Sequence, residues 1–263
     1  MKSILIPTDF SDTATNAVFY GAELAHKFGL ELVLMHCMHV PVTDVNGSIS
    51  LLEILMQNEK EASDIKLNKL AQEIKEKFDV HIVILSEFGL AADMIISECE
   101  TREIDLVVMG TSGASGFLSG LLGSVSSSVA RNSEVPVLTV PLLAKFDGLR
   151  IMAFAEDHKE SSRNELVFIY DFIKKLGSKL DKISVEPESD EYNTEIIFDE
   201  GGIREVSVWA ETVEEGISTY ITNENIDLLV LKHHKRNLFQ DLFQKSTTKE
   251  LLNKNTIPLL IFN

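Results

Sequence analysis

Short apolar runs alternate with longer amphipathic segments along the first half of the chain. The runs are nearly continuous in apolar residues, which is typical of parallel strands buried on both faces of a sheet. The strands predicted in this way span residues 3–7, 31–37, 81–85, 105–109 and 135–140. The amphipathic segments predict helices at about 12–28, 51–78, 89–100 and 124–132. This alternation indicates an α/β fold, in which helices cover both faces of a parallel sheet.

The same pattern recurs in the second half, after a turn-rich segment at residues 141–149. Its last two apolar runs match their counterparts in the first half at a common offset of 122 residues. The matched pairs are 104–109 with 226–231 and 135–139 with 257–261, and residues 4–8 correspond to 151–155. Two tandem copies explain a chain of 263 residues better than one large domain. We therefore place the domains at residues 1–143 and 144–263.

The second copy is abbreviated relative to the first. Its second and third predicted strands, around residues 183–185 and 206–208, are separated by only about twenty residues. The long helix predicted at 51–78 in the first copy therefore has little room in the second.

Composition and charge limit the class of protein and the kind of partner. Apolar residues make up 44% of the chain and charged residues 25%, as in soluble globular proteins. No apolar run approaches the roughly eighteen residues that a membrane span needs, and the run after Lys2 is too short for a signal peptide. Cys37 and Cys99 form no disulfide framework, which fits a reducing cytoplasm. The formal charge of −17 disfavours nucleic acid and anionic membranes as partners.

A glycine-rich loop joins the predicted strand 105–109 to a predicted helix N-terminus. Backbone N–H groups in such a loop can point at a phosphate. Without a Cβ, Gly110 and Gly113 can take positive φ and let a ligand lie against the main chain. Gly123 should allow close approach of the helix N-terminus, with the Ser124 hydroxyl as a further donor. The segment 109–124 contains no Lys or Arg, so phosphates would depend on backbone donors, with or without Mg²⁺.

The spacing Gly110-x2-Gly113-x9-Gly123-Ser124 matches the nucleotide-binding signature of the universal stress protein family. The segment Pro7-Thr8-Asp9-x-Ser11 resembles the first-strand motif of the same family. The resemblance implies the strand order 3-2-1-4-5 of adenine nucleotide alpha hydrolase-like domains and an adenine nucleotide, ATP or AMP, in the first domain. It also implies that Asp9 hydrogen-bonds the ribose and that the backbone at Cys37 meets the adenine, with Met109 lining the pocket. The implied site residues are Pro7, Thr8, Asp9, Cys37, Met109, Gly110, Gly113, Gly123, Ser124 and Val125.

The glycine loop, Cys37, Met109 and Asp9 also have plain structural interpretations. The glycine loop could be a turn that packs closely against a neighbouring strand, and Cys37 and Met109 could be ordinary core. Asp9 could cap a helix or form an Asx-turn, roles that do not exclude a ribose contact.

Metal binding and catalysis lack sequence support. His36 and His39 point to opposite faces of an extended chain, so they should not converge on a metal. Asp9 and Ser11 have no identifiable general base, and the chain has no P-loop lysine motif, nucleophile elbow or HExxH.

The second copy lacks the glycines of the signature. At the offset of 122 residues, Gly110, Gly113 and Gly123 stand opposite Lys232, Lys235 and Lys245, while Asp9 falls near Glu156 or Asp157. Because each lysine adds a side chain where the ligand would lie, we expect no nucleotide site there. The basic loop around His233 and His234 could still attract anions by charge.

The resemblance, together with the composition, implies a cytoplasmic stress-response protein whose first domain binds an adenine nucleotide as a sensor or regulator. The alternatives are a nucleotide-free scaffold for a protein partner and a slow ATPase. The apolar strands 135–140 and 257–262 would leave exposed edges if unpaired, so we expect the two domains to pair through them as an internal pseudo-dimer. The resemblance supports this, because family members often associate through this strand; a homo-oligomer remains open.

Overall fold

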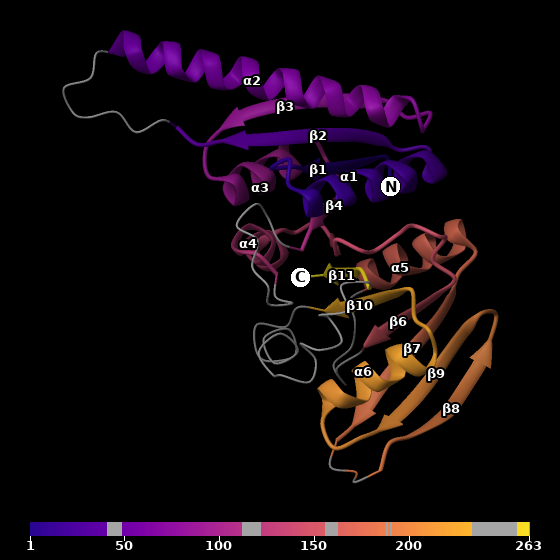
Figure 1. The fold of residues 1–263 in the computed structure, drawn as a ribbon. Coiled ribbons are helices and arrows are strands. Elements are labelled where there is room, and N and C mark those ends of the chain that lie inside the picture. The colour runs from indigo at the N-terminus through magenta and orange to yellow at the C-terminus, as the bar shows by residue number, and fades with distance from the viewer. Residues whose placement is uncertain are drawn as a thin grey trace.

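The computed structural model describes residues 1–40, 49–111, 122–155, 163–187, 189, 191–232 and 257–262. Within these ranges, eleven strands form one sheet in the order β3-β2-β1-β4-β5-β11-β10-β6-β7-β9-β8 (Figure 1). Each half of this sheet belongs to one half of the chain. The α/β fold of two tandem units predicted from the sequence is therefore confirmed.

The first domain has the predicted strand order 3-2-1-4-5, with every neighbouring pair parallel. Its elements are β1 (Ser3–Pro7), α1 (Asp12–Phe28), β2 (Glu31–Met38), α2 (Ile49–Lys75), β3 (Ile82–Phe88), α3 (Ala91–Thr101), β4 (Leu106–Gly110), α4 (Ser124–Asn132) and β5 (Val137–Val140). Helices α1 and α2 bury apolar side chains on one face of the sheet, and α3 and α4 on the other. Gly29 ends α1 in the left-handed conformation, at φ 64°, which glycine adopts readily at the end of a helix.

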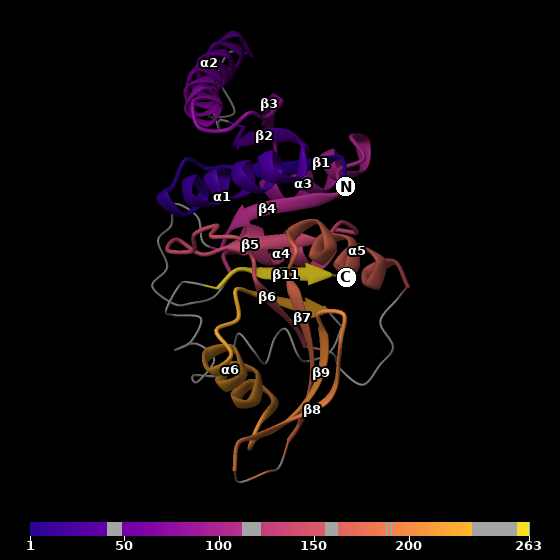
Figure 2. The ribbon, with the colours of Figure 1, turned by 90° about the vertical axis from the view of Figure 1, so that its right-hand side faces the viewer.

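The second domain repeats this order with one addition at its outer edge. Its elements are β6 (Ile151–Ala155), α5 (Arg163–Leu176), β7 (Lys179–Glu186), β8 (Asn193–Glu200), β9 (Ile203–Trp209), α6 (Val213–Asn223), β10 (Leu228–Lys232) and β11 (Leu259–Phe262). Helices α5 and α6 lie on opposite faces of the sheet (Figure 2).

Strand β8 replaces the long helix α2 in the second domain. It runs antiparallel to β9 and joins it through a two-residue turn at Gly201 and Gly202, whose φ angles are 63° and 84°. Two successive positive φ values define the type I′ turn, which matches the twist of paired strands and favours glycine. The short interval between the second and third repeated strands thus holds a hairpin, as its length allows.

Because no described helix covers β7 as α2 covers β2, the two strands differ in the polarity of their side chains. In β2, which lies under α2, Leu32, Val33 and Leu34 are all fully buried or nearly so. In β7, half-buried Lys182 and Ser184 alternate with buried residues on the opposite face. Such alternation is what a sheet with one solvated face requires.

The strand register corrects the sequence alignment of the first strands by one residue. Ile4 pairs with Leu106 in the first domain, and Met152 pairs with Leu228, the counterpart of Leu106, in the second. Residue 151 therefore corresponds to residue 3 and not to residue 4, because pairing with the adjacent strand sets the register. Of the two alternatives for the counterpart of Asp9, this register selects Asp157, which lies outside the described residues.

Strands β5 and β11 join the two halves of the sheet. They pair antiparallel, with Leu138 opposite Leu260, and all residues of both strands are buried. The expected pairing of the two apolar edges is therefore present. Neither strand remains an edge of the described sheet, whose outer strands are β3 and β8.

The segment that connects the domains, in which we place the boundary after residue 143, is fixed to α1. The side-chain amide of Asn16 donates hydrogen bonds to the carbonyl oxygens of Pro141, at 2.8 Å, and Ala144, at 3.0 Å. Tyr20 packs edge-on against Phe146, with ring centroids 5.2 Å apart. The Tyr20 hydroxyl is buried and, among the described residues, has no hydrogen-bond partner.

We predict that Tyr20→Phe raises the free energy of unfolding by about 1 kcal/mol. The substitution keeps the ring against Phe146 and removes a buried hydroxyl that is desolvated without compensation. Equilibrium urea denaturation of the full chain measures the change. A loss of stability would show instead that the hydroxyl is hydrogen-bonded in the native protein.

Candidate functional site

The carboxyl ends of β1, β2 and β4 meet at one edge of the first domain. Strand β1 lies between the other two, so topology alone brings the residues after Pro7 beside Cys37 and Met109. This is the point at which the strand order reverses, where open α/β sheets bind their ligands. Thr8 and Met109 are buried there, Pro7 and Cys37 are half-buried, and Asp9 is exposed.

Asp9 forms an Asx-turn and does not cap α1. Its Oδ1 accepts a hydrogen bond from the backbone N–H of Ser11 at 3.0 Å, and the Ser11 hydroxyl caps α1 by accepting from Ala14. The intervening Phe10 has φ 64°, a left-handed conformation that is uncommon for a residue other than glycine. The backbone N–H of Phe10 donates to the Thr8 hydroxyl at 3.0 Å. The turn is thus held by local hydrogen bonds that leave Asp9 at the surface.

Two side chains from other elements support this turn. His36 Nδ1 lies 2.7 Å from the carbonyl oxygen of Thr8, which can only accept, so Nδ1 carries the proton. The rings of His36 and Phe10 pack together, with their centroids 4.6 Å apart. The Nζ atom of Lys66, on α2, lies over the Phe10 ring, 5.3 Å from its centroid. Sequence reasoning missed this cluster, because residues far apart in the chain form it.

Gly110 has a role different from the one that the sequence suggested. It does not adopt positive φ, so the structure does not use the left-handed freedom that glycine offers at this position. A Cβ at this position would lie 3.0 Å from Cγ2 and 3.1 Å from the carbonyl oxygen of Thr13. Glycine is needed because the first turn of α1 approaches β4 this closely. Gly113 lies outside the described residues.

Helix α4 begins at the same edge without a side-chain cap. Its N-cap is Gly123, at φ −59°, so this glycine does not use positive φ either. The hydroxyl of buried Ser126 donates to the carbonyl oxygen of Gly110 at 2.8 Å and ties the helix to the end of β4. Ser124 and Val125 are exposed, and N–H groups in a first helical turn have no partner within the helix. The arrangement offers uncapped donors and the positive end of a helix dipole.

The two thiols are not activated nucleophiles. Burial, together with the charges of Glu87 and Glu98, raises the pKa of the Cys37 thiol to about 11. Burial is also the main cause that raises the pKa of Cys99 to about 12. Both side chains are therefore protonated at neutral pH, and thiolate chemistry has no support at this edge.

The equivalent edge of the second domain ends in Lys232, where β4 ends in Gly110. Lys235 and Lys245, the counterparts of Gly113 and Gly123, lie outside the described residues, as does the loop of His233 and His234.

Within the described ranges, no group of three or more His, Cys, Asp or Glu residues could hold a metal ion. No described helix has the length and apolar character that crossing a bilayer requires.

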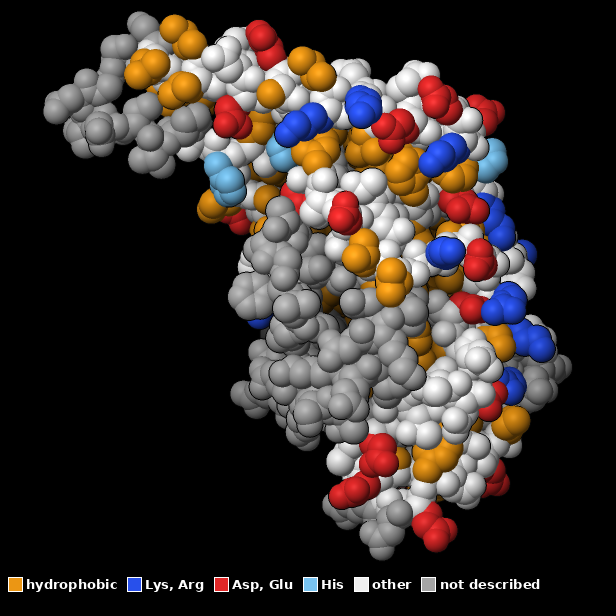
Figure 3. Space-filling view, viewed as in Figure 1, with side chains coloured by type: hydrophobic (Ala, Val, Ile, Leu, Met, Phe, Trp, Pro, Cys, Tyr) orange, Lys and Arg blue, Asp and Glu red, His pale blue; other side chains and the backbone are white. Residues whose placement is uncertain are grey.

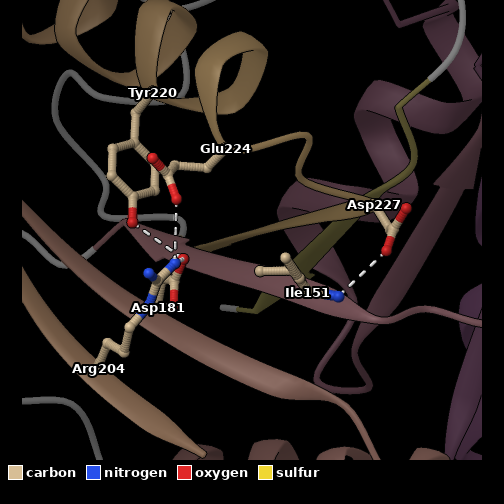
Figure 4. A network of polar contacts seen from close by, with 6 residues as sticks. All are labelled: Ile151, Asp181, Arg204, Tyr220, Glu224 and Asp227. Carbon is tan, nitrogen blue, oxygen red and sulfur yellow. Dashed lines mark hydrogen bonds and ion pairs between the residues drawn. The ribbon is translucent and has the colours of Figure 1, made fainter. Parts of the chain in front are cut away.

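A buried polar network lies in the second domain, near the start of β7 (Figure 4). Asp181 is fully buried and accepts two hydrogen bonds from Arg204, at 2.7 and 2.5 Å, and one from the hydroxyl of Tyr220 at 2.9 Å. Arg204 also donates to Glu224 at 3.2 Å. The hydrogen bond with Asp181 is the main cause that raises the pKa of Arg204, while burial is the main cause that raises that of Tyr220.

The strand register shows which contact of the first domain corresponds to this polar network. Asp181 pairs with Arg204 as Val33 pairs with Val83 in the first domain. The network therefore substitutes a satisfied ion pair for an apolar contact, at the strand ends opposite to the ligand edge. Its complete hydrogen bonding and position point to a structural role.

We predict that Arg204→Met destabilises the protein by about 3–5 kcal/mol, because it leaves the buried Asp181 carboxylate without its cation. The matched variant Asp181→Val/Arg204→Val/Tyr220→Phe, which restores the apolar pair of the first domain, should stay within about 2 kcal/mol of the natural protein. Urea denaturation gives both values. Equal losses in the two variants would contradict this account of the network.

Comparison with known proteins identifies the relatives of this chain. The sequence model of the universal stress protein family matches residues 1–141 and, separately, residues 152–263. Universal stress protein Slr1230 of Synechocystis is 28% identical across the full length of both chains. Universal stress protein MJ0531 of Methanocaldococcus jannaschii is 34% identical over 53% of this chain and 81% of its own.

A solved structure shares the two-domain fold. The crystal structure of a universal stress protein from Archaeoglobus fulgidus superposes with a TM-score of 0.68 at 18% identity, over 99% of this chain and 96% of its own. The two matches of the family model cover both domains and show that the chain belongs to the universal stress protein family, as a tandem member.

Proposed function

We propose that the first domain binds an adenine nucleotide, ATP or AMP, and that the protein acts in the cytoplasm as a nucleotide-dependent sensor or regulator of a stress response. The observation that carries the proposal is the position of two features at the carboxyl ends of the adjacent strands β1 and β4: the Asp9 turn follows β1, and Ser126 fixes the N-terminus of α4 to Gly110 at the end of β4. Family membership and the spacing of the glycine signature support it.

In this proposal, each part of the nucleotide meets a different element. The phosphates lie at the glycine signature, against the backbone donors of Ser124 and Val125. Asp9 accepts a hydrogen bond from the ribose, and its exposed position supports that role. The adenine meets the backbone at Cys37, with Met109 beneath it. Since the segment 109–124 has no Lys or Arg, Mg²⁺ would neutralise a triphosphate there.

The second domain takes no nucleotide in this proposal and serves packing or a partner. A lysine ends β10 at the position of Gly110, and two more lysines replace the other signature glycines. Their charge could support weak, salt-sensitive anion binding, because exposed charges are screened over about 8–10 Å. The stoichiometry should therefore be one nucleotide per chain.

We predict that Ser124→Glu lowers the affinity for MgATP at least about tenfold. The new carboxylate would repel the phosphates, and about 1.4 kcal/mol of repulsion is enough for a tenfold loss of affinity. The helix dipole stabilises a Glu in the first turn of α4, so the substitution should not lower the stability of the fold. Isothermal titration of the full chain with MgATP, and with ATP in EDTA, measures affinity, stoichiometry and the contribution of the metal.

Asn68→Glu, which adds the same charge on the exposed surface of α2, is the matched control and should leave the affinity unchanged. Adenosine, which has no phosphate, should bind the Ser124→Glu variant as it binds the natural protein. An unchanged affinity for MgATP, or an equal loss for adenosine, would contradict the assigned phosphate position. Phosphate release at steady state separates a sensor from a slow ATPase.

We predict that MgATP slows alkylation of Cys37 by iodoacetamide at pH 9 at least about threefold, because an adenine against the backbone at Cys37 would restrict access of the reagent to this residue. Since the pKa is raised to about 11, the rate without nucleotide should rise about tenfold per pH unit between pH 8 and 10. Peptide mass spectrometry reports both cysteines, and buried Cys99 serves as the internal control. Protection of Cys99 as strong as that of Cys37 would indicate global stabilisation instead of a local contact.

A further inference from the structure

Strand β8 is the outer edge of the sheet at the end of the molecule farthest from α2 (Figure 1). Among the described strands it pairs only with β9. Residues 193–198 are all exposed, whereas no residue of β3, the strand at the other edge, is exposed to that degree. The backbone groups of β8 that point away from β9 therefore form an accessible template for a further strand.

The middle of this edge is apolar. Ile196, Ile197 and Phe198 are 53%, 59% and 44% exposed, and they are the only three consecutive large apolar residues so exposed in the described part of the chain. A β-bulge lies between Ile196 and Phe198, and it leaves Ile197 without an opposite residue in β9. As a result, Ile196 stands opposite Val206 on one face of the sheet and Phe198 opposite Glu205 on the other.

The flanks of the edge are acidic. Residues 191–200 contain Glu191, Glu195, Asp199 and Glu200 and no Lys or Arg. Acidic side chains are also visible around the lower end of the molecule in Figure 3. The edge therefore combines an apolar centre with negative charge on both sides.

These charges disfavour a second copy of the chain as the occupant. Antiparallel pairing of two β8 strands about Ile197 would place Glu195 opposite Asp199 of the other copy, and Thr194 opposite Glu200. Like charges directly opposite each other destabilise a strand pair, and each copy carries a formal charge of −17. Acidic residues thus protect the edge from self-association while leaving it open to a strand of opposite charge.

We propose that β8 is a docking site for an extended segment of a partner protein, with apolar residues at its centre and Lys or Arg at both ends, which adds to the sheet as a further strand. Backbone hydrogen bonds to β8 supply a general affinity. Contacts with Ile196, Ile197 and Phe198 and pairing with the flanking carboxylates supply the selectivity. The site does not depend on nucleotide binding in the first domain.

The test uses the full chain and two fluorescent peptides, Lys-Lys-Val-Ile-Val-Lys-Lys and its charge-reversed form Glu-Glu-Val-Ile-Val-Glu-Glu. Fluorescence anisotropy should show that the basic peptide binds at least tenfold more tightly, and that rising salt weakens it. Amide hydrogen exchange should show protection of residues 193–200 on binding. Equal binding of both peptides, no binding of either, or protection elsewhere would overturn the proposal.

Two variants test the centre and the flanks separately. Glu191→Lys/Glu195→Lys, at exposed positions, should weaken the basic peptide at least tenfold, as should Ile197→Lys at the bulge. The matched control Glu53→Lys/Glu59→Lys makes the same charge change on exposed α2 and should have no effect. Concentration-dependent dimerisation of the peptide-free protein, with protection of β8 that Ile197→Lys removes, would identify a second copy as the occupant and overturn the proposal.

Discussion

The pairing of β5 with β11 is the contact on which the arrangement of the whole molecule depends. Each strand ends the parallel sheet of its own domain, and the residues of both strands are buried and, apart from Thr139, apolar, so that water cannot solvate them favourably. Pairing them converts two apolar edges into the centre of one sheet. Because the pair is antiparallel, the carboxyl ends of the strands in the two domains point in opposite directions at this junction. The candidate nucleotide edge is therefore separated from its counterpart in the second domain.

The rest of the contact between the domains follows from this junction. The connecting segment lies along α1, where Asn16 satisfies the carbonyl oxygens of Pro141 and Ala144. Phe28 of α1 packs against Phe172 of α5 at 5.4 Å, within one apolar cluster that spans both domains. A shared cluster of this kind favours joint stability over independent motion of the domains.

The two copies differ at the outer ends of the sheet. The first domain keeps α2, which covers β2 and supplies Lys66 to the cluster around the Asp9 turn. The second domain has no described helix between β7 and β9, and β8 extends the sheet in its place. Polar side chains on the solvated face of β7 and carboxylates along β8 accommodate the change. The repeat thus retains a common sheet while its two outer edges present different surfaces.

Apolar patterning in the sequence determined the α/β fold, the tandem repeat, the shortened interval in the second copy and the apolar edges that pair, but it did not predict strand β8 within that interval. These features follow from local periodicity, and hydrophobic burial enforces them throughout the chain. The resemblance to the universal stress protein family, which supplied the strand order, implied that Asp9, Cys37 and Met109 lie at one edge, because strand order dictates which strand ends are neighbours.

Only the tertiary structure decided the features that depend on distances between remote segments. The reason for glycine at position 110 is the approach of Thr13, which no local pattern reveals. The register of β6, the contact of His36 with the Thr8 carbonyl and the burial of Asp181 likewise arise from packing between distant elements. Local sequence specifies which elements form, but their side chains acquire partners only when non-local packing brings them within a few ångströms.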